Sequence, residues 1–168
     1  MANITQPLRD EHSELLPEVE TLRIAAEAAG SAPPPELQGR VDDAYGFLAH
    51  HLIPHAQAEE RALYPVVGRA MGAPEATATM SRDHVEVGRL TEELAVLRGA
   101  LAAGHVGQAE TRNLRRVLYG LYALVRLHFA KEEEVYLPIL DARLTAEEAA
   151  EMFETMEQAA AEARTAVT

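Results

Sequence analysis

The chain has 168 residues, a formal net charge of −12 and no cysteine. A chain of this length is expected to fold as a single domain over residues 1–168, and without cysteine any bound metal must have nitrogen and oxygen ligands. The acidic balance argues against a nucleic-acid partner, and because the sequence shows neither a membrane-length apolar run nor a signal-peptide pattern, we expect a cytoplasmic protein that does not bind membranes.

The composition predicts an all-α fold. Ala, Leu, Glu and Arg dominate, and aromatic residues are only 5% of the chain. Breakers at Gly30–Pro35, Gly72–Pro74 and Gly104–Gly107 divide the first 140 residues into four long helical segments. A fifth segment opens at Thr145, with Glu148 placed to form a capping box. We therefore expect an up-down-up-down four-helix bundle at about 5–140 and an additional C-terminal helix at about 145–165.

Each of the first four segments carries an apolar stripe with steps of three and four, which is typical of a bundle seam. Histidine and glutamate interrupt these stripes. At a rise of about 1.5 Å per residue, one histidine of each segment lies about 25–30 Å from the turn end of the bundle, so we expect them at one level. The interruptions are, in chain order, His12, His51, His55, Glu59, His84, His128 and Glu132.

The interruptions belong to an internal repeat. HAQAEERALYP at His55–Pro65 corresponds to HFAKEEEVYLP at His128–Pro138, and the acidic contexts RDEH and SRDH precede them at His12 and His84. Because a helical pair cannot bury its own apolar face, two such pairs are expected to stack and bring equivalent residues together.

Prolines occur inside two of the helical segments. A proline removes an intrahelical hydrogen bond and usually bends the helix, and this applies to Pro17 and Pro54. Since Pro54 falls between His51 and His55, we expect a kink or bulge at the proposed site, which makes the direction of His51 the least determined.

Two pairs of residues are spaced to chelate a metal. His55 with Glu59, and His128 with Glu132, are four apart and share one helix face. Imidazole and carboxylate together suit iron, manganese or zinc, and carboxylates can bridge two ions. A satisfied core histidine would explain any one of these residues alone, whereas the duplicated set favours a metal centre, since buried carboxylates need a positive partner.

Two glutamates and two tyrosines near these ligands can each be interpreted in more than one way. Glu60 and Glu133 lie off the stripes and are interpreted as supporting or solvated groups. Tyr64 and Tyr136 can pack over the cluster, although an aromatic residue at helical spacing is also typical of a core.

Together these motifs resemble the hemerythrin-like family of HHE cation-binding domains. The resemblance implies a bundle that holds a non-heme pair of iron ions with terminal histidines, two bridging carboxylates and an oxygen bridge. Manganese and zinc suit the same ligand types. The motifs that carry it are RDEH at Arg9–His12, HLIPHAQAEERALYP at His51–Pro65, RDH at Arg82–His84 and HFAKEEEVYLP at His128–Pro138.

The resemblance also implies roles for single residues. A carboxylate five positions after a histidine is another bridging spacing in the family, so Glu133 is an alternative to Glu132. The terminal ligands would be His12, His55, His84 and His128, and the bridges would be Glu59 and Glu132.

One feature departs from the oxygen carriers of the family, which have two histidines four apart on the third helix. Here the positions four away from His84 are Met80 and Gly88, so His51 is the candidate for a fifth imidazole. Two six-coordinate ions offer about twelve positions. Two bridging carboxylates, an oxygen bridge and five imidazoles leave about one open, whereas four imidazoles leave about two.

Three functions are compatible with this centre. The first is a binding protein for O₂ or a related small diatomic molecule. The second is an enzyme that acts on peroxide or nitric oxide, with Tyr64 or Tyr136 as redox partners. The third is an iron store or iron-responsive module with the helix at 145–164 as partner surface, although that helix has an apolar stripe suited to packing on the bundle.

Overall fold

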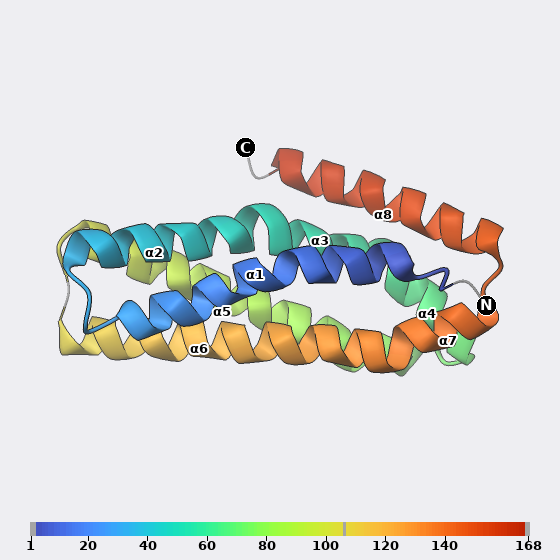
Figure 1. Ribbon diagram of the computed structural model, residues 1–168, viewed down its shortest axis with the longest axis horizontal. Coiled ribbons are helices and arrows are strands. Elements are labelled where there is room, and N and C mark those ends of the chain that lie inside the picture. Colours follow the sequence, from blue (N-terminus) through green and yellow to red (C-terminus); the bar gives the residue numbers. More distant parts are fainter. Residues whose placement is uncertain (1–2, 106, 167–168) are drawn as a thin grey trace.

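The computed structural model describes residues 3–105 and 107–166, which form helices joined by short turns without any β-strand (Figure 1). The helices are α1 (Gln6–Ala28), α2 (Pro34–Phe47), η1 (Leu48–Leu52), α3 (Ile53–Ala58), η2 (Glu59–Leu63), α4 (Tyr64–Met71), η3 (Pro74–Thr77), α5 (Ala78–Ala102), α6 (Gln108–Lys131), η4 (Glu132–Tyr136), α7 (Leu137–Arg143) and α8 (Ala146–Ala166).

Several of these helices continue one another and form rods. The first rod is α1, the second runs from α2 to α4, the third is η3 with α5, and the fourth runs from α6 to α7. Successive rods run in opposite directions in Figure 1. Because α1 packs against α2 and α6, and α5 packs against the same two helices, the four rods close into a bundle. The predicted all-α fold is therefore confirmed.

The rods end where the sequence predicts. Gly72 follows α4 with a φ of 68°, and Gly104 follows α5 with a φ of 83°, a backbone conformation that glycine adopts without strain. At the start of α8, the Thr145 N–H donates to Glu148 Oε2 (2.9 Å), and the Glu148 N–H donates to Thr145 Oγ1 (3.2 Å). The expected capping box is thus present.

Three wide π-helical turns interrupt the second and fourth rods. They are η1, η2 and η4, and in each case a proline stands two positions after the turn: Pro54, Pro65 and Pro138. A proline has no N–H to donate and its ring crowds the preceding turn, and a wider turn accommodates both effects. The bulge expected near Pro54 is therefore present, and two more, η2 and η4, occur that the sequence pattern did not predict.

The core consists of two apolar clusters with a polar layer between them. The turn-side cluster lies toward Gly30 and Gly104 and includes Leu22, Leu94 and Leu121. The α8-side cluster lies at the other end and includes Leu63 and Met152. The polar layer contains the buried groups His12, His55, Glu59, His128 and Glu132.

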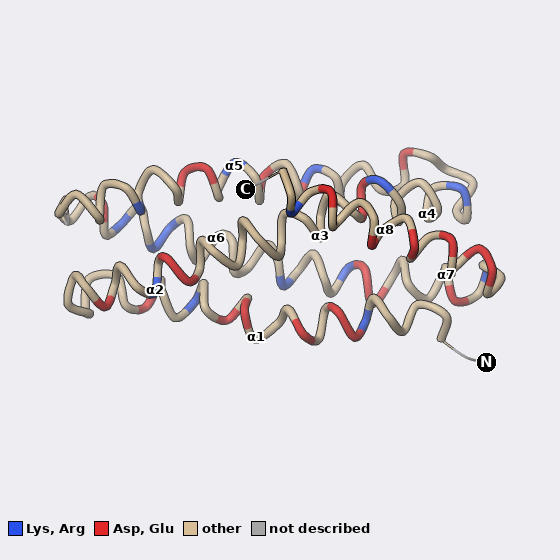
Figure 2. Tube along the Cα trace, turned by 90° about the horizontal axis from the view of Figure 1, so that it is seen from above, with Lys and Arg blue, Asp and Glu red and all other residues tan. Residues whose placement is uncertain are grey.

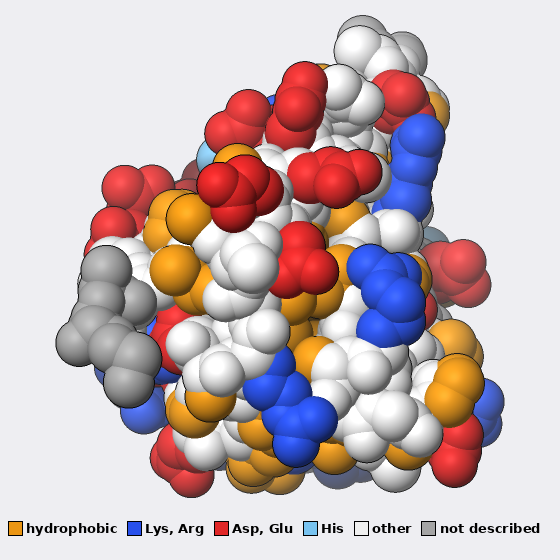
Figure 3. Space-filling view, turned by 90° about the vertical axis from the view of Figure 1, so that its right-hand side faces the viewer, with side chains coloured by type: hydrophobic (Ala, Val, Ile, Leu, Met, Phe, Trp, Pro, Cys, Tyr) orange, Lys and Arg blue, Asp and Glu red, His pale blue; other side chains and the backbone are white. Residues whose placement is uncertain are grey.

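The fifth rod, α8, lies against α3 and η2 on the outside of the bundle (Figure 1). Its apolar stripe packs on the α8-side cluster, with Ala149, Met152, Met156 and Ala159 buried. From the end that carries α4 and α7, acidic side chains gather over α8, with basic side chains among and below them (Figure 3). The helix therefore turns its apolar face inward and its charged face outward.

Lys, Arg, Asp and Glu residues are distributed along all the rods (Figure 2). Among the described residues, none of the helices combines the length and the apolar character that crossing a bilayer requires.

Candidate metal centre

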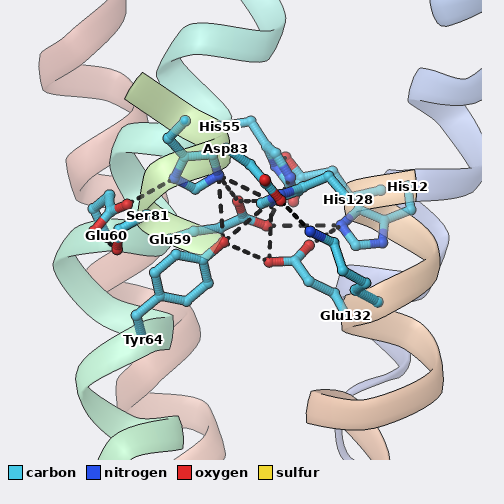
Figure 4. A network of polar contacts seen from close by, with 12 residues as sticks. His12, His55, Glu59, Glu60, Tyr64, Ser81, Asp83, His128 and Glu132 are labelled. Carbon is cyan, nitrogen blue, oxygen red and sulfur yellow. Dashed lines mark hydrogen bonds and ion pairs between the residues drawn. The ribbon is translucent and has the colours of Figure 1, made fainter. Parts of the chain in front are cut away.

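The four rods bring six of the predicted residues into one cluster (Figure 4). In each of two groups, every residue offers a ligand atom within 4.8 Å of the others. Glu59 belongs to both groups. The first contains His12, His55, Glu59 and Glu132, and the second contains Glu59, His84 and His128.

The cluster is shielded from solvent. The side chains of Glu59, Glu132 and His12 are fully buried, and His84 is the most exposed member at 11%. The ring of Phe129 stacks on His12 at a centroid distance of 4.2 Å, so an apolar face lies directly behind one imidazole. Charges in such an environment need close partners of opposite sign.

Glu59 lies between two pairs of imidazoles. Its Oε1 is 2.9 Å from the Nε2 atom of His55 and 3.7 Å from that of His12. Its Oε2 is 3.2 Å from the Nε2 atom of His84 and 3.8 Å from that of His128. One carboxylate oxygen therefore faces each imidazole pair, which is the arrangement that a bridging carboxylate needs.

Glu132 shows the same arrangement. Its Oε2 is 3.4 Å from His12 Nε2, and its Oε1 is 3.5 Å from His128 Nε2. The two carboxylates thus define two positions, each facing two imidazoles. We refer to the position at His12 and His55 as the first position, and to the position at His84 and His128 as the second position.

Each of the four imidazoles is also held from the outside by a carboxylate. The Nδ1 atoms lie 2.8–3.1 Å from a carboxylate oxygen. The carboxylate always comes from the adjacent preceding rod, so the contacts run once around the bundle. The pairs are Glu11 with His55, Glu60 with His84, Asp83 with His128, and Glu133 with His12.

This ring of outer carboxylates determines the tautomer and the orientation of the imidazoles. When Nδ1–H donates to a carboxylate, the lone pair of Nε2 is free and points to the middle of the cluster. Both the orientation of the ring and its tautomer are then suited to a metal ion.

Two of these outer carboxylates were missed in the sequence. Glu11 and Asp83 stand directly before His12 and His84 in the repeated motifs, which was the available signal. Their partners, however, are histidines on the next rod, and the spacing along one helix cannot reveal such a contact. Glu60 and Glu133 are supporting groups, as interpreted, and Glu132 rather than Glu133 lies inside the cluster.

His51 lies outside the cluster, contrary to the prediction. Its side chain is 54% exposed, and its Nδ1 is 3.6 Å from Glu18 Oε1 at the surface. The π-turn η1 explains the difference, because a wide turn shifts the seam by one residue. The buried residue after Leu48 on the seam is therefore Leu52 instead of His51.

The hydroxyls of Tyr64 and Tyr136 lie in different surroundings. The Tyr64 hydroxyl donates to Glu132 Oε1 at 2.9 Å (Figure 4). It also lies close to the Nε2 atoms of His128 and His84. The Tyr136 hydroxyl instead donates to the Ala76 carbonyl at 2.9 Å. Burial, with the charges of Glu59 and Glu132, raises the pKa of Tyr64, so the phenol is neutral beside the carboxylates.

The electrostatics of the cluster couple its acids and bases. Burial alone would lower the pKa of His55, but the charge of Glu59 and the hydrogen bond with Glu11 raise it well above its ordinary value. Burial also lowers the pKa of His128. The hydrogen bonds to Glu132 and Glu59 outweigh this effect and raise the pKa to about 10. For Glu59, burial raises the pKa, but the charge of His55 lowers it well below 4.5. Protons on imidazoles thus compensate the buried carboxylate charge.

The cluster fits cations on a direct structural criterion. Seven buried side-chain polar atoms lack a hydrogen-bond partner within residues 3–105 and 107–166, and five of them belong to the cluster. Neutral imidazole nitrogen and carboxylate oxygen suit iron, manganese and zinc, so the donor set fits two such ions. The five atoms are His12 Nε2, His55 Nε2, both carboxylate oxygens of Glu59, and Glu132 Oε2.

A small apolar cavity of about 10 Å³ adjoins the cluster. This volume corresponds to about one water-sized sphere. On the cluster side it is lined by His55, Glu59, His84 and His128, and on the bundle side by Leu52, Ala56, Val87, Val125 and Phe129.

Comparison with known proteins identifies a family. The family model described as the hemerythrin HHE cation binding domain matches residues 3–140, which cover the whole cluster and the four rods up to Leu140, but not α8. No curated protein and no solved structure matches the chain.

Proposed function

The chain belongs to the hemerythrin family of HHE cation-binding domains, and from this premise we propose that it holds two iron ions and binds O₂ or a related small diatomic molecule beside them. The family match and the buried His/Glu cluster indicate cation binding. Beyond cation binding, we propose that the metal is iron, that two ions are bound and that the external ligand is a small diatomic molecule.

The observation that carries the proposal is the division of each bridging carboxylate between two imidazole pairs. Glu59 presents one oxygen to each pair, and Glu132 does the same. A single ion would use only one side of this arrangement. Two ions would use every unpartnered atom of the cluster and would neutralise both buried carboxylates.

The surrounding residues prepare the site for a small neutral ligand. The outer carboxylates hold the four imidazoles in one orientation, so that little reorganisation is needed when ions bind. Val87, Val125 and Phe129 make the adjoining cavity apolar, which favours a diatomic molecule over water and ions. Bound ferrous iron would supply the electrons that O₂ binding requires.

The test is the spectrum of the iron-loaded protein. The protein is loaded anaerobically with ferrous iron, its metal content is measured, and its absorption is recorded before and after O₂ is admitted. We expect about two irons per chain and new near-ultraviolet and visible bands that fade when O₂ is removed. An iron content near zero, or a spectrum that O₂ leaves unchanged, would refute the proposal.

A second function is favoured by the position of His51. Because this imidazole lies outside the cluster, four imidazoles remain, and the count of about two open positions favours reactivity toward peroxide or nitric oxide. Steady-state peroxide consumption by the iron-loaded parent and by His51→Ala decides this. Equal turnover by both would support an enzyme, and no turnover by either would exclude it.

The third function, an interaction module that uses the last helix, has less support. The apolar stripe of α8 is covered by the α8-side cluster. Its outward face carries mainly acidic side chains, as expected for a solvated surface.

A further inference from the structure

Tyr64 is buried, but packing in the apolar core does not explain where its hydroxyl lies. Its side chain is 3% exposed, and its hydroxyl lies 3.1 Å from His128 Nε2 and 3.3 Å from His84 Nε2. It also donates to Glu132 Oε1 at 2.9 Å. A buried tyrosine needs one hydrogen-bond partner, whereas this hydroxyl lies close to three atoms that all face the second position.

The π-turn η2 places Tyr64 at the cluster. In this turn the Tyr64 N–H donates to the Glu59 carbonyl, five residues earlier. In a regular α-helix the equivalent bond would come from Leu63, four residues after Glu59. The extra residue in the turn therefore brings Tyr64, instead of Leu63, onto the face that carries Glu59.

The internal repeat provides a comparison within the same chain. The π-turn η4 in the fourth rod is equivalent to η2, and there the Leu137 N–H donates to the Glu132 carbonyl. Leu137 thus occupies the position that corresponds to Tyr64, and it has no polar atom in its side chain. The neighbouring phenol of Tyr136 instead donates a hydrogen bond to the Ala76 carbonyl. The two halves of the repeat therefore differ in side-chain chemistry at this position.

We propose that Tyr64 is a further oxygen ligand of the ion at the second position, and of that ion alone. The proposal rests on the proposed function, since it needs iron in the cluster. When the phenol oxygen binds ferric iron, the O–H bond breaks and its proton leaves to solvent, so one proton is released for each Tyr64 bound.

The two ions would then differ in accessibility. The second position would have five protein donor atoms, from His84, His128, Glu59, Glu132 and Tyr64, and the first position would have four. With the same preferred coordination number at both ions, the first position keeps one more free site. A small external ligand is therefore directed to the ion beside His12 and His55.

The experiment compares the iron-loaded, oxidised parent with Tyr64→Phe and with the matched control Tyr136→Phe. Metal content, visible absorption and resonance Raman spectra are measured for all three. We expect about two irons in each protein. A phenolate-to-iron charge-transfer band with enhanced tyrosine ring vibrations should appear in the parent and in Tyr136→Phe, and should be absent from Tyr64→Phe.

The outcomes separate this inference from the proposed function. A parent protein that holds two irons but shows no phenolate signal would overturn the Tyr64 inference and leave the function standing, as would a signal that persists in Tyr64→Phe. A parent protein that binds no iron would overturn both. The parent spectrum decides even if Tyr64→Phe does not fold, because ring-deuterated tyrosine must shift the enhanced vibrations if a phenolate is bound.

Discussion

The turn-side cluster and the polar layer are neighbours in one bundle, but they are stabilised by different means. The turn-side cluster holds only apolar side chains such as Leu22, Leu94 and Leu121, and packing suffices to stabilise it. The polar layer buries Glu59 and Glu132, whose burial is unfavourable unless positive partners are present. Stability in the first region is therefore independent of metal, and in the second it depends on what neutralises the carboxylates.

The largest expected effect is on the polar layer itself. Glu59→Leu removes the shared bridge and replaces a buried carboxylate by an apolar group of similar size. We expect the variant to lose metal-linked stabilisation, about 4 kcal/mol when free metal is a thousandfold above Kd. The metal-free variant should be at least as stable as the metal-free parent. Thermal unfolding with and without ferrous iron measures both quantities, and a normal metal-induced rise in Tm would contradict the assigned bridge.

The next effect concerns the turn-side cluster. Leu121 is completely buried, so Leu121→Ala should lower the free energy of unfolding by about 3 kcal/mol through lost burial and a new cavity. Because the substitution lies in the metal-independent region, the loss should be the same with and without metal. Denaturant unfolding of both forms tests this. A loss seen in only one form would show that the two regions are not separate.

The pH dependence of metal binding should be somewhat smaller. The pKa of His128 is raised to about 10 from an unfolded value near 6.5, so its protonation stabilises the metal-free fold fully below pH 6.5, and this contribution is lost as the pH rises through 10. A metal ion must displace this proton. Affinity for ferrous iron should therefore rise from pH 6 to pH 8 by about tenfold per pH unit for each proton released. Anaerobic titrations at fixed ionic strength measure it, and a flat profile would exclude proton displacement.

The smallest effect is expected at the outer carboxylates. Glu11→Gln weakens the hold on His55 Nδ1 without removing a ligand, so metal affinity should fall by about tenfold. Glu14→Gln makes the same charge change on an exposed side chain of the same helix and is the matched control. Competition titration with a chelator compares the two variants. Equal affinities would mean that Glu11 acts only through its charge.

Much of the fold and of the cluster could be predicted from the sequence. Helix boundaries depend on local signals, and Gly72, Gly104 and the capping box at Thr145 provided them. Six cluster residues could be identified because each interrupts an apolar stripe at the same distance from the turns. That His12 and the other five residues bind metal stays a prediction.

The position of His51 and the contacts between rods could not be predicted, because they depend on geometry that the periodicity of a regular helix does not describe. The periodicity of a regular helix places His51 on the seam, but the π-turn η1 shifts the seam to Leu52. The contacts of Glu11 and Asp83 cross between rods and therefore have no fixed spacing. A useful signal was nevertheless present, because a proline follows each of the three π-turns at the same distance.

A crystal structure of the iron-loaded protein, with anomalous scattering measured at the iron edge, is the most direct test for two ions in the polar layer. We predict two iron peaks, one beside His12 and His55 and one beside His84 and His128, with Glu59 and Glu132 bound to both. A single peak, or iron bound outside this layer while Glu59 and Glu132 remain without metal, would contradict this prediction.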